Sequence, residues 1–176
     1  SSITGATALA VQPASDDEIV FSDAGTLKRL DIKHIQNTPA FHVTNPQNGS
    51  MDSGAQEIME FDTEVLDSDG CFDTSTFRFT PGVQGKYFIY WSIRWQSATA
   101  AATRIDSVVK FNGSSDAISA RNSNSDYSPV NGSGVLNMDA DDYIELLGYH
   151  NHSGAAEVTT ETGYTYFGAF RVSGVS

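Results

Sequence analysis

Short apolar runs, some of them alternating with polar residues, recur along the chain, and the longest aromatic run lies in Lys86–Trp95. Because successive side chains in a strand point to opposite faces, this segment predicts one strand with two differently composed faces. One face carries Phe88 and Tyr90 and then turns polar at Ser92. The other face is apolar throughout and consists of Tyr87, Ile89, Trp91, Ile93 and Trp95. Since both faces are apolar at the start, we expect a strand buried between two layers.

The same alternation, interrupted by turn residues, predicts further strands along the rest of the chain. Asn112-Gly113 separates two apolar runs and predicts a hairpin. Phe77 and Phe79 alternate with polar neighbours and predict one half-buried strand over residues 72–80. The other predicted strands begin at Phe41, Ser133, Tyr143 and Tyr164. About eight short strands without a long helical pattern predict an all-β protein of two packed sheets.

The N-terminal region differs from the rest of the chain. Residues 1–17 are small and polar, and two short apolar runs then flank Asp23-Ala24-Gly25, which predicts a hairpin over 18–32. Too few apolar residues are present for this hairpin to fold alone, so we expect it to pack against another surface. We therefore divide the chain into an arm, residues 1–37, and a main domain, residues 38–176. The arm's basic residues, either a solvated face or a docking patch, are Lys28, Arg29 and Lys33.

The composition limits the classes of partner that we expect for this protein. The 176 residues include 10 Lys+Arg and 22 Asp+Glu, a formal net charge of −12. Nucleic-acid binding needs clustered cations that neutralise phosphates, so we expect no nucleic-acid partner. No apolar stretch is long enough to span a bilayer, so we expect no membrane insertion. A single cysteine, Cys71, excludes an internal disulfide, and without a neighbouring base or cation we expect it to be a buried thiol and not a nucleophile.

Several motifs follow one another in a specific order in the main domain. Phe41 follows Pro39-Ala40, and a turn containing Pro81 and Gly85 precedes Tyr87-Phe88. Phe167-Gly168-Ala169-Phe170 then follows near the C-terminal end of the sequence. In this order the motifs over Pro39–Val172 resemble the globular-head family of complement C1q, in the C1q/tumour-necrosis-factor superfamily. The resemblance implies a jelly-roll β-sandwich that assembles as a homotrimer, although Asp141 stands where the family usually has glycine.

A second resemblance concerns the arm. The segment Ser22–Arg29 is similar to one that precedes trimeric tips in bacteriophage tail-fibre and other virion proteins. Together the two resemblances imply a virion protein, either a fibre, a spike or a capsid decoration, whose head contacts a glycan or protein of the host surface. They also imply that the arm docks to other virion proteins, with the candidate contacts Phe21, Leu27, Lys28 and Arg29.

A different class of protein is the alternative, namely a secreted C1q/TNF-like trimeric ligand or lectin that acts on a receptor or glycan. Asn-x-Ser sequons would offer glycan sites in such a protein. Turn chemistry explains the Asn-Gly-Ser sequences among them equally well. The sequons begin at Asn48, Asn112, Asn131 and Asn151.

Two groups of residues could hold a metal ion. The acidic turn that contains Asp139 and Asp142 offers the hard oxygen ligands that calcium prefers, although its spacing lacks the EF-hand pattern. The family resemblance places calcium, where present, near the trimer apex, where Asp126 is the nearest carboxylate. We therefore name Asp126, Asp139 and Asp142 as candidate calcium ligands, while no cofactor is required. His150 and His152 lack a third ligand, so we expect an exposed loop pair and no zinc site.

Catalysis is not expected, because the chain contains no nucleophile elbow, phosphate loop or dinucleotide fingerprint. Most aromatic residues favour the core or a subunit interface, among them Tyr87, Phe88, Trp91, Phe167 and Phe170. Trp95 lies at a strand end beside a polar loop, and Tyr127 and Tyr149 lie in or next to similar loops. Since Trp and Tyr anchor interfaces, we expect these three residues to contact a partner at the surface.

Overall fold

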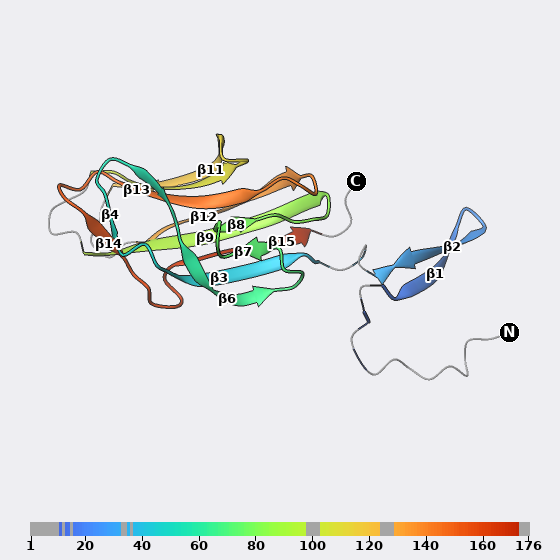
Figure 1. Ribbon diagram of the computed structural model, residues 1–176. Coiled ribbons are helices and arrows are strands. Elements are labelled where there is room, and N and C mark those ends of the chain that lie inside the picture. Colours follow the sequence, from blue (N-terminus) through green and yellow to red (C-terminus); the bar gives the residue numbers. More distant parts are fainter. Residues whose placement is uncertain are drawn as a thin grey trace. The chain divides into compact units, whose positions relative to one another are not determined.

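The computed structural model describes residues 11, 13–14, 16–32, 35, 37–97, 103–123 and 129–172. The chain forms two compact units, Ser1–Gln36 and Asn37–Ser176. Every extended regular element in the described ranges is a strand (Figure 1). Among these residues no helix is long and apolar enough to cross a membrane.

The strands run β1 (Glu18–Asp23), β2 (Thr26–Asp31), β3 (Ala40–Pro46), β4 (Ser50–Met51), β5 (Gln56–Ile58), β6 (Phe61–Asp67), β7 (Phe72–Asp73), β8 (Arg78–Phe79), β9 (Gly85–Ser97), β10 (Ile105–Phe111), β11 (Ser115–Asn122), β12 (Pro129–Met138), β13 (Ile144–His150), β14 (Ala156–Val158) and β15 (Tyr166–Val172).

The first unit contains the predicted hairpin. Strands β1 and β2 pair antiparallel from Glu18↔Asp31 to Asp23↔Thr26. The two residues between them, Ala24 and Gly25, adopt φ values of 48° and 85°. Two-residue hairpin loops need this left-handed backbone because it matches the twist of the strands. The hairpin prediction is confirmed, and every residue of β1 is exposed.

The second unit is a sandwich of two sheets. One sheet, here called the β10 sheet, has the order β11-β10-β13-β8-β7, with β5 also paired to β13. The other, here called the β9 sheet, has the order β4-β14-β9-β15-β3-β6, with β12 also paired to β9. Several neighbouring strands are distant in sequence, as Figure 1 shows for β3 beside β15, whereas β10–β11 and β7–β8 are consecutive along the chain. The predicted all-β jelly-roll sandwich is confirmed.

The core lies between the sheets and is built around β9. The alternation predicted for this strand is confirmed, because the five residues from Tyr87 to Trp95 at odd positions are all buried. At the centre, the indole Nε1–H of Trp91 donates to Oγ of Ser107 on the facing sheet at 2.7 Å. Gly132 on β12 leaves room for this indole, since a Cβ there would lie 2.5 Å from Trp91 Cζ2.

One predicted strand is wrong. Residues 72–80 form the two short strands β7 and β8 joined by a tight turn, and not one continuous strand. The Asp73 carboxylate accepts hydrogen bonds from the Ser75 N–H and hydroxyl at 2.8 and 2.6 Å, and from the Thr76 hydroxyl at 3.0 Å. These bonds reverse the chain, and Phe77 takes a left-handed φ of 59°. Local side-chain hydrogen bonding therefore overrides the apolar alternation.

We predict that Gly132→Ala destabilises the folded sandwich by about 1–3 kcal/mol, because the added methyl group must displace the buried Trp91 indole. Gly85→Ala is the matched control, since the nearest atoms to a Cβ there are Nε, Cγ and Cδ of the Arg171 side chain, which is not packed in the core. Urea unfolding at one protein concentration measures both. Equal stability of the two variants would contradict this account of Trp91 packing.

Candidate functional site

An aromatic face covers the outer side of the β9 sheet. We define it as Phe88 and Tyr90 of β9, Tyr166 and Phe170 of β15, and His42 of β3, which share this side because they alternate with the buried residues of their strands. Ring centroids lie 5.4 Å apart for Phe88–Phe170, 6.3 Å for Phe88–Tyr90 and 5.8 Å for Tyr90–His42. The rings thus form one continuous strip across three strands.

A glycine allows this strip to lie close to the backbone. Gly168 is paired with both Tyr90 and His42. A Cβ at Gly168 would lie 2.4 Å from Tyr90 Cζ, so the Tyr90 ring covers the bare backbone of β15. The face is extended at its edge by Val135 of β12, which pairs with Phe88 and is 54% exposed. A flat apolar surface of this kind is typical of protein–protein contacts.

The aromatic face carries no formal charge at neutral pH. Burial lowers the pKa of the His42 imidazole, which favours its neutral form. Burial, together with the neighbouring Tyr166, raises the pKa of Tyr90. The two groups lie 3.1 Å apart, from His42 Nδ1 to Tyr90 Oη. A polar contact inside an aromatic surface adds directional specificity without adding charge.

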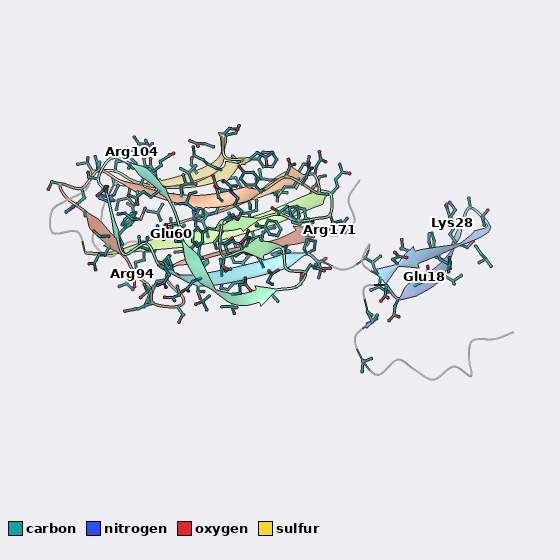
Figure 2. The ribbon with its side chains drawn as sticks, viewed as in Figure 1. Glu18, Lys28, Glu60, Arg94, Arg104 and Arg171 are labelled. Atoms are coloured by element: carbon teal, nitrogen blue, oxygen red, sulfur yellow. The ribbon has the colours of Figure 1, made fainter. Side chains whose placement is uncertain are left out.

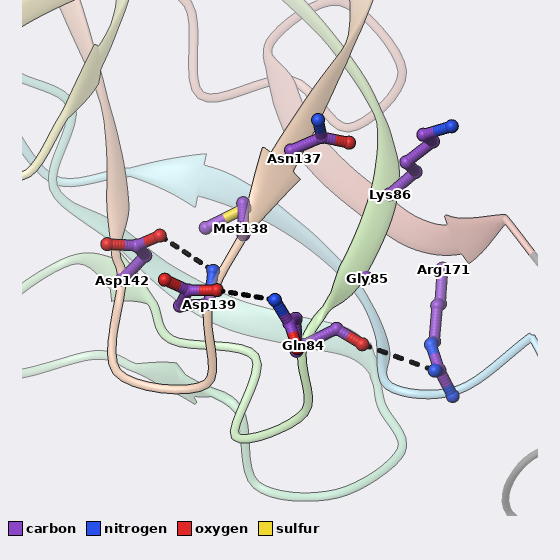
Figure 3. Close-up of a pocket in the computed structure, with 8 residues that line it drawn as sticks. All are labelled: Gln84, Gly85, Lys86, Asn137, Met138, Asp139, Asp142 and Arg171. Carbon is purple, nitrogen blue, oxygen red and sulfur yellow. Dashed lines mark hydrogen bonds between the residues drawn. The ribbon is translucent and has the colours of Figure 1, made fainter. Parts of the chain in front are cut away.

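The acidic turn lies at one end of the sandwich and is shown in Figure 3. The Asp139 N–H donates to Asp142 Oδ2 at 2.7 Å, and Asn112 Nδ2 donates to Asp142 Oδ1 at 2.8 Å. Gln84 Nε2 donates to Asp139 Oδ1 at 2.8 Å. These carboxylates therefore join three loops and border an open groove of about 750 Å³ that also contains Lys86.

The described residues contain no group of three His, Cys, Asp or Glu side chains that could hold a metal ion. Asp139 and Asp142 lie together, but Asp126 lies outside the described residues. Two carboxylates that accept hydrogen bonds from the protein form a turn, while calcium usually takes six to eight oxygen ligands. The calcium site stays a prediction.

The exposed histidine pair is a wrong prediction, because both side chains are buried. His150 faces the core as the last residue of β13, and its ring centroid lies 4.9 Å from that of Trp95. Its Nδ1 accepts the backbone N–H of His152 at 3.2 Å, so Nε2 carries the proton and donates to the Met51 carbonyl at 3.0 Å. Both ring nitrogens of His150 thus form hydrogen bonds within the folded chain.

The three expected surface aromatics have different outcomes. Trp95 is 1% exposed, so its surface contact is a wrong prediction for the single chain. The reason is that β9 continues to Ser97 and pairs with β14 at Val158, which keeps Trp95 on the core side of the strand. Tyr149 is half-buried on the outer side of the β10 sheet, and Tyr127 lies outside the described residues.

The candidate docking residues lie on the N-terminal hairpin (Figure 2). Phe21 and Leu27 are 39% and 75% exposed. Lys28 forms an ion pair with Asp23, and Arg29 Nη1 lies 2.8 Å from Glu18 Oε2. The charges of Lys28 and Arg29 are therefore paired with carboxylates across the hairpin, while Lys33 lies outside the described residues. Exposed ion pairs contribute little free energy, so the exposed apolar side chains are the stronger candidates for contact with a partner.

Cys71 is buried, as predicted. Its Sγ–H donates to Asp67 Oδ1 at 3.0 Å. Burial and the neighbouring Asp67 carboxylate raise the pKa of the thiol strongly. Because the thiolate is the nucleophile, this environment keeps the group inert and gives it a structural part at the β6–β7 junction.

Sequence reasoning missed three members of the aromatic face, His42, Tyr90 and Tyr166. A signal for them was present, since aromatic residues occupy the even positions at the start of β9 and again in β15. These residues form one surface because their strands are neighbours in the sheet. The order of strands in the sheet decides this, and it cannot be read from the sequence of one strand.

The fold and its aromatic face define a β-sandwich protein of the jelly-roll class. The chain matches the C1q domain over residues 40–171 and belongs to the C1q domain family. No curated protein matches the chain.

Solved structures share the fold at low sequence identity. Murine APRIL has 15% identity and a TM-score of 0.60, and covers 76% of this chain and 98% of its own. The globular domain of zebrafish complement 1qA has 20% identity and a TM-score of 0.57, over 78% of this chain and 98% of its own. Eiger TNF from S. frugiperda has 12% identity and a TM-score of 0.59, over 80% and 96%. These likenesses show that the second unit has the jelly-roll fold of C1q and TNF proteins.

We predict that the free energy of unfolding decreases as the pH falls from about 7 to about 5, and that His42 contributes to this decrease. The lowered pKa of His42 means that the unfolded chain, whose histidine titrates near 6.5, binds more protons in this range. Acid therefore favours unfolding. The contribution of His42 to the free energy of unfolding is fully present only above about pH 6.5. Urea midpoints measured across this range test the effect.

His42→Phe should flatten this part of the pH profile, because it keeps a ring and removes the titrating group. Tyr90→Phe is the control, since it removes the hydroxyl that lies 3.1 Å from His42 and leaves the imidazole in place. Parallel profiles for the wild type and His42→Phe would show that other groups carry the dependence.

Proposed function

We propose that the chain is a subunit of a non-enzymatic homotrimer that serves as a fibre, spike or capsid-decoration protein of a bacteriophage virion. Its jelly-roll head projects from the particle and contacts the host surface, and its arm docks to other virion proteins. The observation that carries the assembly is the aromatic face, which exposes an uncharged surface on a chain with a net charge of −12.

Charge gives the physical reason for assembly through this face. Three acidic subunits repel one another unless they meet through surfaces without carboxylates. The aromatic face meets that condition, because its five residues are neutral at pH 7 and are only half-covered in the single chain. Homotrimers are common in the C1q/TNF superfamily, which supports a threefold arrangement of this face.

The docking part of the proposal rests on the N-terminal hairpin. A two-stranded sheet is marginally stable in water by itself. This hairpin exposes Val20 and Leu27 at 66% and 75%, together with Ile19 and Phe21 at 39% each. Apolar side chains on both of its faces favour a role in which a partner covers the hairpin.

The environment of the sequons favours the virion role over a glycosylated secreted ligand. Asn48 Nδ2 donates to the Ile58 carbonyl at 2.6 Å. Asn112 and Asn151 are bonded in the same way, through Nδ2, to Asp142 and Thr103, both at 2.8 Å. A glycan would replace one of the two hydrogens on each of these nitrogens and would place a bulky group beside a hydrogen bond of the fold. Asn131 is exposed on β12 but pairs with Ser92 on the outer side of the β9 sheet, where a glycan would obstruct assembly.

We predict that the wild-type protein has a mass of about 57 kDa in solution, three times the chain mass of 18.9 kDa. Tyr90→Lys should give a monomer at roughly 10 µM, because burying an unpaired ammonium group costs several kcal/mol. Val83→Lys is the control, since Val83 is exposed in the turn before β9 and lies outside the aromatic face. Light scattering measures the masses. A monomeric wild type, or a trimeric Tyr90→Lys, would contradict assembly through this face.

We also predict that the double variant Phe21→Asp, Leu27→Asp remains trimeric but is incorporated into virions about tenfold less than the wild type, since apolar anchors carry most of an interface's free energy. Arg29→Gln is the control, because its charge is already paired with Glu18. Quantitative mass spectrometry of purified particles gives the readout. Absence of the wild-type protein from virions would overturn the virion role and leave the trimer untouched.

A further inference from the structure

A row of polar side chains crosses the outer side of the β10 sheet. Gln56, Tyr149, Asp106 and Arg121 are directly opposite one another on β5, β13, β10 and β11. Directly opposed residues of antiparallel strands project from the same face, so these four side chains form one line across four strands. Arg104 precedes Asp106 by two positions and joins the row from the same side. Figure 2 shows Arg104 at the opposite end of the sandwich from Arg171.

The centre of the row is a buried carboxylate held by two guanidinium groups. The Asp106 side chain is 6% exposed. Arg104 Nε donates to Oδ2 at 2.7 Å, and its Nη2 donates to the same oxygen. Arg121 Nε donates to Oδ1 at 2.7 Å and its Nη2 to Oδ2 at 3.3 Å. These hydrogen bonds from the arginines outweigh the effect of burial and lower the pKa of Asp106, so the carboxylate stays ionised.

One arginine would neutralise Asp106, so the second arginine is a surplus cation. Asp116, which also lines this site, is paired with Lys110 at 3.6 Å. The lining of this site has two arginines and two aspartates, and Lys110, which lies beside it, brings the cluster to a formal charge of +1 on a chain whose net charge is −12. Because Lys110 offsets Asp116, the second arginine remains available to attract a monovalent anion.

The guanidinium groups are preorganised and retain donors for a ligand. Arg104 Cζ lies 4.6 Å from the centre of the Tyr149 ring, so the ring supports one side of the guanidinium while Asp106 fixes its plane. Both arginines use Nε and Nη2 for Asp106, and no acceptor for either Nη1 is found among the described residues. The side chains of Arg104 and Arg121 are 42% and 64% exposed, so these donors are accessible.

The same residues line a surface pocket of about 260 Å³, whose other walls include Gln56 and Ser119. Guanidinium groups bind planar carboxylates with two parallel hydrogen bonds, and neutral amide and hydroxyl groups suit sugar hydroxyls. The small volume suits one sugar residue and not an extended ligand. We propose that this pocket, with Arg104 and Arg121 as its anion-binding groups, binds the carboxylate of an acidic saccharide.

The location of the pocket agrees with contact to an outside surface. It lies on the β10 sheet, whereas the aromatic face lies on the β9 sheet, so assembly through the aromatic face leaves the pocket open. The inference supplies a ligand class for the proposed recognition of a host surface and rests on that role for its biological setting. Binding itself requires only the purified trimer.

Saturation-transfer NMR with D-glucuronate as the probe tests the inference on the full chain. We expect binding with a dissociation constant on the order of 1 mM, as for one charged contact on a small ligand. The neutral methyl ester of glucuronate should bind about tenfold more weakly, because it cannot form the charge-assisted pair with the arginines. Arg121→Gln should weaken glucuronate binding by about the same factor, while Arg121→Lys should keep part of the affinity.

Arg78→Gln is the matched control. Arg78 lies on the same sheet, pairs with the buried Glu145 at 3.0 Å and stacks over Tyr143, but it has no second arginine beside it. The affinity of the Arg78→Gln variant for glucuronate should equal that of the wild type, provided that Arg78→Gln and Arg121→Gln first show the wild-type mass and melting temperature. Should Arg121→Gln fail to fold, the comparison of acid with ester on the wild type still decides the proposal.

Three outcomes would overturn the inference: equal binding of the acid and its ester, undiminished binding by Arg121→Gln, or inorganic phosphate competing more strongly than glucuronate. The last outcome would assign the site to phosphate groups. Because none of these measurements involves particles, a protein that binds glucuronate but is absent from virions retains the site and loses the virion role.

Discussion

Strand β9 is the constraint on which the rest of the molecule depends. It extends from Gly85 to Ser97 and is hydrogen-bonded along most of its length to β12 on one side and β15 on the other. Both edges of β9 are paired through the backbone, so its side chains project from its two faces. Both faces begin with aromatic residues. One face fills the core around the Trp91–Ser107 hydrogen bond, while the other supplies Phe88 and Tyr90 to the aromatic face. The core and the aromatic face are thus two sides of one strand.

The net negative charge of the chain restricts which surfaces can meet in a trimer. A trimer would carry three times the formal charge of −12, so its subunits must meet through neutral surface. Burial keeps His42 neutral on the aromatic face, in agreement with this requirement. The surplus arginine beside Asp106 lies on the other sheet, where a positive charge remains available to a ligand. In the arrangement that we propose, the β9 sheet therefore serves assembly and the β10 sheet serves recognition.

Local patterns predicted those elements in which neighbouring residues decide the outcome. The odd positions of β9 and the hairpins at Ala24-Gly25 and Asn112-Gly113 followed from alternation and turn chemistry. Predictions failed where a distant segment intervened. Trp95 is buried because β14 extends the sheet beside it, and His150 is buried because its ring packs against Trp95. The Asp73 turn was a local feature that the alternation of Phe77 and Phe79 concealed.

The sequence by itself determined the all-β class, the central strand, the buried inert cysteine and the resemblance to C1q heads, because these depend on periodicity, turn residues and motif order within short windows. Only the tertiary structure decided which surfaces exist. The aromatic face requires β3, β15 and β9 to be neighbours, and the row from Gln56 to Arg121 requires the registers of four strands. Strand order and register arise from long-range packing, and one residue of slippage would turn either surface into core.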